Sequence, residues 1–535
     1  MKKIFFFALY IVLVSCGSSK KTVYKPLPNV TDFQNTITEE GLFLDLSIIA
    51  SDSLEGRDTG SDGERKAADY LASRYREFGL SPVGDDETFF QYFTLVKPFV
   101  DSIQYRLMVD DELLDQSTHS ANSIGSFNTL IGGKTSKNGG IVFVGYSIFD
   151  EETGVNHFDI DVEGKWMFGF YDRTISSFST MQRLVNEQNA LGAIMIAETD
   201  EESFIDQAYI MQGEFEQSSG LQLPYLNKIE DDGAFNSIRP KLAATLLGLD
   251  SIAALSELES EIKTEPSTFV PYEIPGTLEH IPSLSNVEVQ TRNVVAFIEG
   301  TDPDLNDEVI VLTSHYDHVG ISEPDANGDS INNGADDDGS GTVGLLHAAQ
   351  AFSVAKQAGA EIKRSILFLN VSGEERGLLG SRYYSDHPIF PIENTIANLN
   401  VDMIGRRDNE NVDTPDYVYI IGGKIISSNL QTILEQANKL SVNIELNDRY
   451  NDLNDPSQFY RRSDHWNFGR LGIPFIFFFN GTHADYHRVS DEVEKIDFEA
   501  LKKRTKLLFM TAALLANSDT IPQVDNQQFI LRTKE

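Results

Sequence analysis

Acidic and imidazole side chains gather in the second half of the chain, in short motifs that could bind metal ions. His315-Tyr316-Asp317 follows one apolar run, and Glu374-Glu375 follows another. Asp402 and His487 come after two further apolar runs, and Asp337 is the middle residue of an Asp-Asp-Asp triplet. Imidazole and carboxylate groups that converge in one cleft suit borderline divalent metals, Zn²⁺ first. Because crowded carboxylates repel each other unless cations neutralise them, these motifs together predict a metal site.

The elements that must position these motifs are short apolar runs alternating with helical patterns. The expected strands are Val294–Ile298, Val309–Leu312, Ile366–Val371, Ile396–Val401 and Pro474–Phe479. The expected helices are Val343–Ala355, Gly377–Tyr384, Leu430–Leu440 and Phe498–Leu515. This alternation predicts an α/β fold with a mostly parallel sheet sandwiched by helices. Ligands bind at the carboxyl ends of the strands of such sheets, and nearly every strand here ends in a carboxylate or an imidazole.

Taken together, six motifs resemble the zinc-dependent exopeptidases with two co-catalytic metals, a family typified by secreted bacterial leucyl aminopeptidases. The motifs are His315–Asp317, Gly334–Gly341, Gly373–Ser381, Asn400–Gly405, Ser463–His465 and Tyr486–Asp491. The resemblance covers about residues 40–125 and 285–515. It implies the zinc exopeptidase fold and two zinc ions in each chain.

The resemblance also implies which residues bind the metals. Asp337 would bridge the two zinc ions. His315 and Asp402 would complete one site, and Glu375 and His487 would complete the other.

Four further residues receive roles from the same resemblance. Glu374 would be the general base that takes a proton from the attacking water, and later the general acid. Tyr486 would donate a hydrogen bond to the oxyanion. Asp317 would orient His315, and Asp491 would do the same for the other histidine ligand.

The implied function is a metallo-aminopeptidase that removes N-terminal residues from peptides. Glutaminyl cyclase-like activity on the same fold is a second reading, and metal stoichiometry would separate the two. Carboxypeptidase action is a third, because Arg406 and Arg407 could hold a substrate carboxylate. A non-catalytic binding protein is a fourth, but that class typically loses ligands and this chain retains all five.

Two weaker signals lie near the predicted cleft. His318, His465 and His483 are expected to support the ligands or to lie in loops, since the ligand set is complete without them. Residues 325–330 resemble the start of a calcium loop, although Ser330 stands where glycine belongs. A turn at the rim of the cleft is the alternative reading to a calcium site.

The N-terminus resembles a bacterial lipoprotein signal peptide. Two lysines precede the apolar run Ile4–Val14, which is too short to span a membrane. Cys16, the only cysteine of the chain, stands where the lipidated residue of a lipobox belongs. The sequence therefore predicts an exported protein of the cell envelope, anchored to a membrane by lipid at Cys16 and a polar tether over 17–35.

Composition narrows the class of partner and suggests several domains. The chain has 535 residues and a formal net charge of -39, so its surface repels nucleic acid.

Residues 126–275 are strand-rich and resemble a protease-associated domain, with Pro271, Pro275 and Pro282 marking a linker. The predicted segments are a signal peptide (1–16), a tether (17–35), a first peptidase part (36–125), an inserted β-rich domain (126–275), the main catalytic part (285–517) and a C-terminal tail (518–535). The expected partners are peptide substrates, and the sequence leaves the oligomeric state open.

Overall fold

The computed structural model describes residues 28–120, 123–212, 220–226, 233–414 and 416–533. The predicted signal peptide and the lipidation site at Cys16 lie outside the described residues. Within those ranges, no helix combines the length and apolar character needed to cross a membrane.

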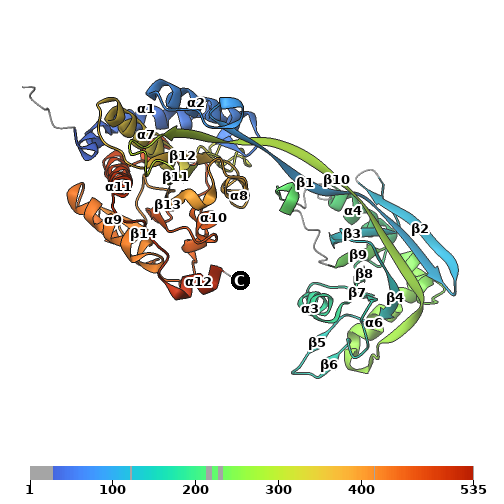
Figure 1. Cartoon of the computed structure of the whole chain (residues 1–535). Helices are drawn as coiled ribbons and strands as arrows, with labels where there is room; N and C mark the ends of the chain where they lie inside the picture. Colours follow the sequence, from blue (N-terminus) through green and yellow to red (C-terminus); the bar gives the residue numbers. More distant parts are fainter. Residues whose placement is uncertain (1–27, 121–122, 213–219, 227–232, 415, 534–535) are drawn as a thin grey trace, which may run out of the picture.

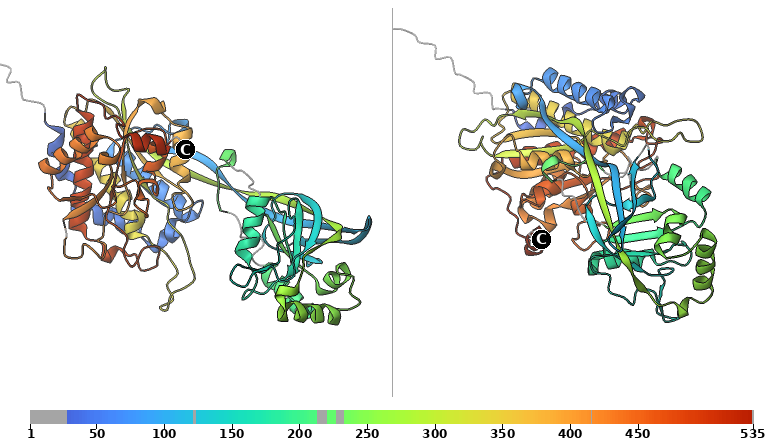
Figure 2. Two further views of the ribbon diagram at one scale, coloured as in Figure 1. Left: turned by 90° about the horizontal axis from the view of Figure 1, so that it is seen from below. Right: turned by 90° about the vertical axis from the view of Figure 1, so that its right-hand side faces the viewer.

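The described chain forms two lobes joined by a pair of long antiparallel strands (Figures 1 and 2). The large lobe comprises residues 28–99 and 285–533, and the small lobe comprises residues 100–284. Strands β1 (Phe90–Val109) and β10 (Tyr272–Ile298) run from one lobe to the other and pair from Phe90 to Val109. Because β10 pairs with β12 at one end and with β4 at the other, a single sheet continues through both lobes.

The sheet of the large lobe has the order β15-β14-β16-β13-β11-β12-β10. Its strands are β11 (Val309–His315), β12 (Ser365–Val371), β13 (Thr395–Val401), β14 (Tyr417–Gly422), β15 (Glu445–Asn447) and β16 (Phe475–Phe479). β11, β12, β13 and β16 are parallel to one another. β10 pairs antiparallel with β12, and β14 pairs antiparallel with β16. This confirms the predicted mostly parallel mixed sheet.

Helices cover both faces of this sheet because strand residues alternate between its two sides. Ile310 and Leu312 of β11 pack with helices on one face, and Val309 and Val311 pack on the other. The first face holds α1 (Glu39–Ile49), α2 (Asp62–Phe78), α7 (Gly341–Gln357), α9 (Ser428–Leu440) and α11 (Phe498–Ala516). The second face holds α8 (Leu379–Asp386) and α10 (His465–Gly469). The helices predicted from the sequence are present, with bounds that differ by a few residues.

The small lobe is itself an α/β structure. Strands β4 (Lys137–Phe143), β7 (Lys165–Phe170), β8 (Gly192–Ile196) and β9 (Ala234–Ile238) are parallel, with β3 (Phe127–Gly132) antiparallel at the edge. Four helices accompany them: α3 (Phe178–Gln188), α4 (Glu201–Gln212), α5 (Pro240–Leu246) and α6 (Ile252–Thr264). The inserted segment is therefore richer in helix than a purely β-rich module.

Packing places the boundary between the lobes earlier than the predicted residue 125. Ile103, Tyr105 and Leu107 share a hydrophobic cluster with the small lobe, and β2 (Glu112–Ser120) pairs only with β1. The proline-marked linker is also wrong, because its prolines flank or lie inside β10. Pro275 lies at a shift in the register between β10 and β4. At Pro282, β10 pairs with β1 and the pairing with β4 has already ended, so the N–H that proline lacks is not needed for hydrogen bonds to β4.

Both predicted terminal segments are partly folded. The predicted tether extends to residue 35, but Val30–Thr36 forms a short helix whose Val30 is buried in the core of the large lobe. The predicted tail contains α12 (Gln527–Thr533), whose Phe529 is fully buried against Phe475. In each case apolar side chains pack on the large lobe, a contact that the polar composition of the segment does not indicate.

Candidate metal centre

The predicted metal-binding residues meet at the carboxyl edge of the large lobe's sheet. His315 is the last residue of β11, Glu375 follows β12 and Asp402 follows β13. Asp337 lies in the loop before α7, and His487 lies in the loop after β16. The parallel strands bring these positions together although 172 residues separate the first from the last in sequence (487 − 315).

One group of ligand atoms surrounds the Nε2 atom of His315. This nitrogen lies 3.3 Å from Asp337 Oδ1 and 3.6 Å from Asp402 Oδ1. All three residues are buried, and their ligand atoms are close enough together to hold one metal ion. The other oxygen of Asp402 accepts a hydrogen bond of 2.6 Å from Ser463, which fixes the carboxylate's orientation.

A second group surrounds the other oxygen of Asp337. His487 Nε2 lies 3.1 Å from Asp337 Oδ2 and 3.0 Å from Glu375 Oε2. His318 completes this group from the opposite side, with its Nδ1 2.9 Å from Glu375 Oε1. The ligand atoms of His318, Asp337 and Glu375 also lie close enough together for one metal ion. The sequence placed His318 among supporting residues, and the structure puts it in direct contact with a predicted ligand.

Asp337 links the two groups because it presents one oxygen to each. It is almost fully buried, and its Oδ2 atom has no hydrogen-bond partner among the described residues. A buried carboxylate oxygen without a donor is costly unless a cation compensates it. The donor set of histidine nitrogens and carboxylate oxygens is one that zinc accepts, so the residues present fit a metal pair.

The electrostatics of the cluster favour positive charge. Burial alone would lower the pKa of His487, but the adjoining carboxylates of Asp337 and Glu375 outweigh burial and raise that pKa to about 10. At His315, burial is likewise outweighed, by the charge of Glu374 and its neighbours, so its pKa is raised well above the usual value. Burial raises the pKa of Glu374 itself. The raised pKa values of the two histidines reflect an excess of carboxylate charge, the condition that attracts a metal cation.

The outer residues of the aspartate triplet organise the site without binding metal. Asp338 Oδ1 accepts the backbone N–H groups of Met403 and Gly341, each at 2.9 Å. Asp336 accepts the backbone N–H of Gly405 at 2.7 Å and lies 3.1 Å from the Nε2 atom of His483. The triplet therefore ties the loop before α7 to the loop after β13, which carries Asp402.

Asp491 supports a different residue from the one predicted. Its Oδ2 atom accepts the backbone N–H groups of Asp336 and Asp337, at 3.0 and 3.1 Å. No contact joins Asp491 to the ring of His487 among the described residues, so the prediction that it orients this ring is wrong. The loop turns between the two residues, and the carboxylate reaches the bridging aspartate instead.

Asp317 contacts both His315 and the predicted general base, through different atoms. His315 Nδ1 lies 3.1 Å from the backbone oxygen of Asp317, and 3.8 Å from its carboxylate. The carboxylate instead accepts the backbone N–H of Glu374 at 3.2 Å and the Thr59 hydroxyl at 3.0 Å. The main chain of Asp317 thus positions the histidine, and its side chain positions the segment that carries Glu374.

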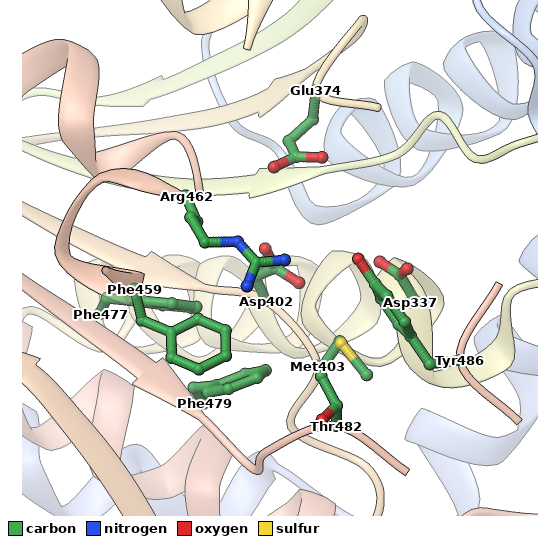
Figure 3. Close-up of a pocket in the computed structure, with 10 residues that line it drawn as sticks. All are labelled: Asp337, Glu374, Asp402, Met403, Phe459, Arg462, Phe477, Phe479, Thr482 and Tyr486. Atoms are coloured by element: carbon green, nitrogen blue, oxygen red, sulfur yellow. The ribbon is translucent and has the colours of Figure 1, made fainter. Parts of the chain in front are cut away.

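A pocket opens beside the cluster and is lined by Asp337, Glu374 and Asp402 on its polar side (Figure 3). Its opposite side is apolar and is formed by Met403, Phe459, Phe477 and Phe479. Tyr486 reaches into it with its hydroxyl toward the carboxylates, and its ring stacks on that of His487 with centroids 3.9 Å apart. Burial raises the pKa of Tyr486, so its hydroxyl stays protonated and can donate.

Arg57 is a site residue that the sequence analysis missed. It is fully buried and donates hydrogen bonds to the backbone oxygens of Tyr316, Asn333 and Gly334, at 2.7, 2.6 and 3.1 Å. Burial lowers its pKa to about 10, which still leaves the side chain charged at neutral pH. Arg57 therefore clamps the loops of His315 and Asp337 together. Its position in sequence carries no motif, because its partners in these two loops lie more than 250 residues away.

The structure bears on two weaker predictions: the calcium loop and the arginines that could hold a substrate carboxylate. Asp325 accepts the backbone N–H groups of Asn327 and Asp329, at 2.7 and 3.1 Å, so its carboxylate is engaged by its own turn. This geometry favours the rim turn over the calcium site. Arg406 pairs with Asp485 at 2.9 Å, and Arg407 pairs with Asp497, so both are engaged by the protein itself.

An α/β sheet whose strand ends share one aspartate between two groups of metal ligands is typical of metal-dependent hydrolases. Residues 293–512 match the sequence model of peptidase family M28. The resemblance to co-catalytic zinc exopeptidases inferred from the motifs is thereby confirmed.

Individual proteins are similar to this chain over parts of its length. A probable leucine aminopeptidase of Arthroderma otae is 25% identical over 263 residues, covering 48% of this chain and 68% of that protein. A probable leucine aminopeptidase 2 of Aspergillus oryzae is 29% identical over 261 residues, covering 44% of this chain and 46% of that protein. The chain thus spans between about half and two thirds of these relatives. Among solved structures, an aminopeptidase from Aneurinibacillus sp. strain AM-1 aligns over 92% of this chain and 96% of its own, with 17% identity and a TM-score of 0.47.

Proposed function

We propose that the protein is a zinc-dependent aminopeptidase with two metal ions in each chain. The observation that carries the proposal is Asp337, a buried aspartate that presents one oxygen to each of two groups of ligands. His315 and Asp402 would hold one zinc ion with it, and Glu375 and His487 would hold the other. When bound, the zinc ions would act as Lewis acids toward the scissile carbonyl and would acidify the attacking water.

Glu374 is the residue that we assign to proton transfer. Its carboxylate lines the pocket and lies 3.9 Å from His315 Nε2, beside the ligands but outside both groups. It would accept a proton from the attacking water and then donate that proton to the leaving amine as the peptide C–N bond breaks. Asp317 keeps the main chain of Glu374 in place through the hydrogen bond described above.

Tyr486 is the residue that we assign to the developing oxyanion. Its hydroxyl points into the pocket, and burial keeps it protonated, so it can donate a hydrogen bond to the oxygen of the attacked carbonyl. The apolar side of the pocket, with three phenylalanines, suits the side chain of a substrate residue.

Two of the alternative activities differ from this proposal in measurable ways. A glutaminyl cyclase-like enzyme would release ammonia from N-terminal glutamine and would need one working metal. A carboxypeptidase would need a cation for the terminal carboxylate, and Arg406 and Arg407 already pair with Asp485 and Asp497.

The test is hydrolysis of leucine p-nitroanilide by the purified full chain, before and after dialysis against a chelator. We expect release of p-nitroaniline, its loss with the metal, and its recovery when zinc is added back. Hydrolysis that survives complete zinc removal would contradict the proposal, and so would ammonia release from N-terminal glutamine without any peptide cleavage.

The location of the protein and the role of its small lobe are also part of the proposal. We propose that Cys16 carries a lipid that holds the protein at the cell envelope. We also propose that the small lobe acts as a protease-associated module beside the active site. Mass spectrometry of the mature N-terminus tests the first of these, because it would reveal a lipid on Cys16.

A further inference from the structure

The pocket contains one cation that the proposed mechanism does not use. Arg462 lies among the residues that line it, at the end of a short helix (Phe459–Arg461), and its guanidinium extends into the pocket between Glu374 and the phenylalanine rings (Figure 3). The side chain is solvent-exposed, and its guanidinium carbon lies 4.8 Å from the centroid of the Phe459 ring. This stacking holds the charge over the apolar side of the pocket.

Arg462 has no acidic partner in the part of the chain that the structure describes, unlike three other arginines of the large lobe. Arg406 and Arg407, near the same strand ends, each pair with an aspartate. Arg470, further along the same segment, pairs with Asp386 at 2.7 Å. A planar guanidinium with free donors, stacked on an aromatic ring, is preorganised to bind a carboxylate through two hydrogen bonds.

The charge around Arg462 decides which substrate groups it favours. An N-terminal amine carries positive charge, which Arg462 repels, so the amine is expected to lie toward Glu374 and the aspartates instead. With four carboxylates at the centre (Asp337, Glu374, Glu375 and Asp402) balanced by two divalent cations, Arg462 leaves its side of the pocket positive. A negatively charged substrate group is the natural complement of that side.

We propose that Arg462 binds a carboxylate of the substrate and so gives the enzyme a preference for acidic ligands. This inference rests on the proposed function, because that function assigns the pocket to substrate. Two sources of the carboxylate share the chemistry: the side chain of an N-terminal glutamate or aspartate, and the terminal α-carboxylate of a short peptide or product.

Binding to matched pairs of amino acids tests the proposal without relying on turnover. The pair L-glutamate and L-glutamine differs only in a side-chain carboxylate, and the pair L-leucine and L-leucinamide differs only in the α-carboxylate. The dissociation constant of each is measured by calorimetry on the zinc-loaded full chain. Since zinc itself favours a carboxylate, the deciding quantity is the change in each acid-to-amide ratio when Arg462 is replaced.

In Arg462→Met, which keeps the aliphatic stem but removes the charge, we expect one ratio to fall about tenfold. A fall in the glutamate pair identifies the side-chain carboxylate, and a fall in the leucine pair identifies the α-carboxylate. The matched control is Arg461→Met. This neighbouring arginine is also exposed, but it contacts Gln458 and lies outside the residues that line the pocket. It should leave both ratios unchanged.

The proposal is overturned if both ratios are the same in wild type and Arg462→Met. It is equally overturned if all four ligands weaken by one common factor, or if wild type binds none of them. Failure of the aminopeptidase proposal gives a different signature, since leucine p-nitroanilide would then remain uncleaved whatever the binding ratios show.

Discussion

The carboxyl ends of the parallel strands differ sharply between the two lobes. In the large lobe, β11, β12 and β13 lead into His315, Glu375 and Asp402, all of which take part in the metal-binding groups. In the small lobe, one buried polar network consists of neutral groups: Tyr105 donates to Asn236 Oδ1 at 2.9 Å and also contacts Thr129. Each group of metal ligands found in the described residues lies in the large lobe. Two α/β regions that share a continuous sheet thus differ in whether their described residues gather metal ligands.

This contrast shows that function resides in unsatisfied chemistry rather than in architecture. A neutral network completes its own hydrogen bonds and stabilises the fold. Buried carboxylates without enough donors cost stability unless a cation binds. The large lobe retains that cost at Asp337 because, on our account, metal binding offsets it.

The largest expected effect comes from replacing the proposed proton carrier in the large lobe. Glu374→Gln should keep the fold and both zinc ions but lower kcat for leucine p-nitroanilide roughly 10³-fold, because the amide cannot accept a proton. Metal analysis and steady-state kinetics on the same preparation measure the two quantities. Near-normal turnover would remove Glu374 from this role, and loss of zinc would make it a ligand instead.

The next effect in size concerns the histidine that touches a predicted ligand. His318→Ala removes the contact with Glu375 Oε1, so we expect about 10- to 100-fold weaker binding of one zinc ion while the other is retained. Zinc content after dialysis against graded chelator concentrations measures this. His318→Asn keeps a donor near the position of Nδ1 and should recover part of the affinity. Equal zinc content in all three proteins would mean that His318 serves packing alone.

The smallest effect tests the small lobe. Tyr105→Phe removes the hydroxyl that donates to Asn236 and contacts Thr129, so we expect about 1 kcal/mol lower stability of this lobe and unchanged kcat. Urea unfolding in a Trp466→Phe background measures it, since Trp166 in the small lobe is then the only tryptophan. A lower kcat in the same variant would show that the small lobe contributes to catalysis, which would contradict the contrast between the lobes.

The sequence predicted that these side chains would gather, because His315, Glu375 and Asp402 each stand at or near the end of an apolar strand, a signal that is local. His315 after β11 and Asp402 after β13 needed only the rule that strand ends meet at one edge of a sheet. The mostly parallel sheet and the helices on both of its faces followed from the same alternation. In these places, local pattern and global fold agree.

The misses share a dependence on contacts between distant residues. Arg57 is buried by loops around residues 316 and 334, and Asp491 turns toward the aspartate triplet because of how two loops cross. The prolines near residue 275 signal a linker locally, but pairing with β1 and β4 continues the strand through them. The helix at Val30 and α12 depend on docking surfaces that a local pattern does not contain.

The most direct test of the account is the anomalous X-ray scattering of zinc in crystals of the purified full chain. We expect two peaks on either side of Asp337, one beside His315 and Asp402 and the other beside Glu375 and His487. A single peak would contradict the two-metal mechanism. Peaks away from Asp337, or none in zinc-loaded crystals, would contradict the metal centre itself.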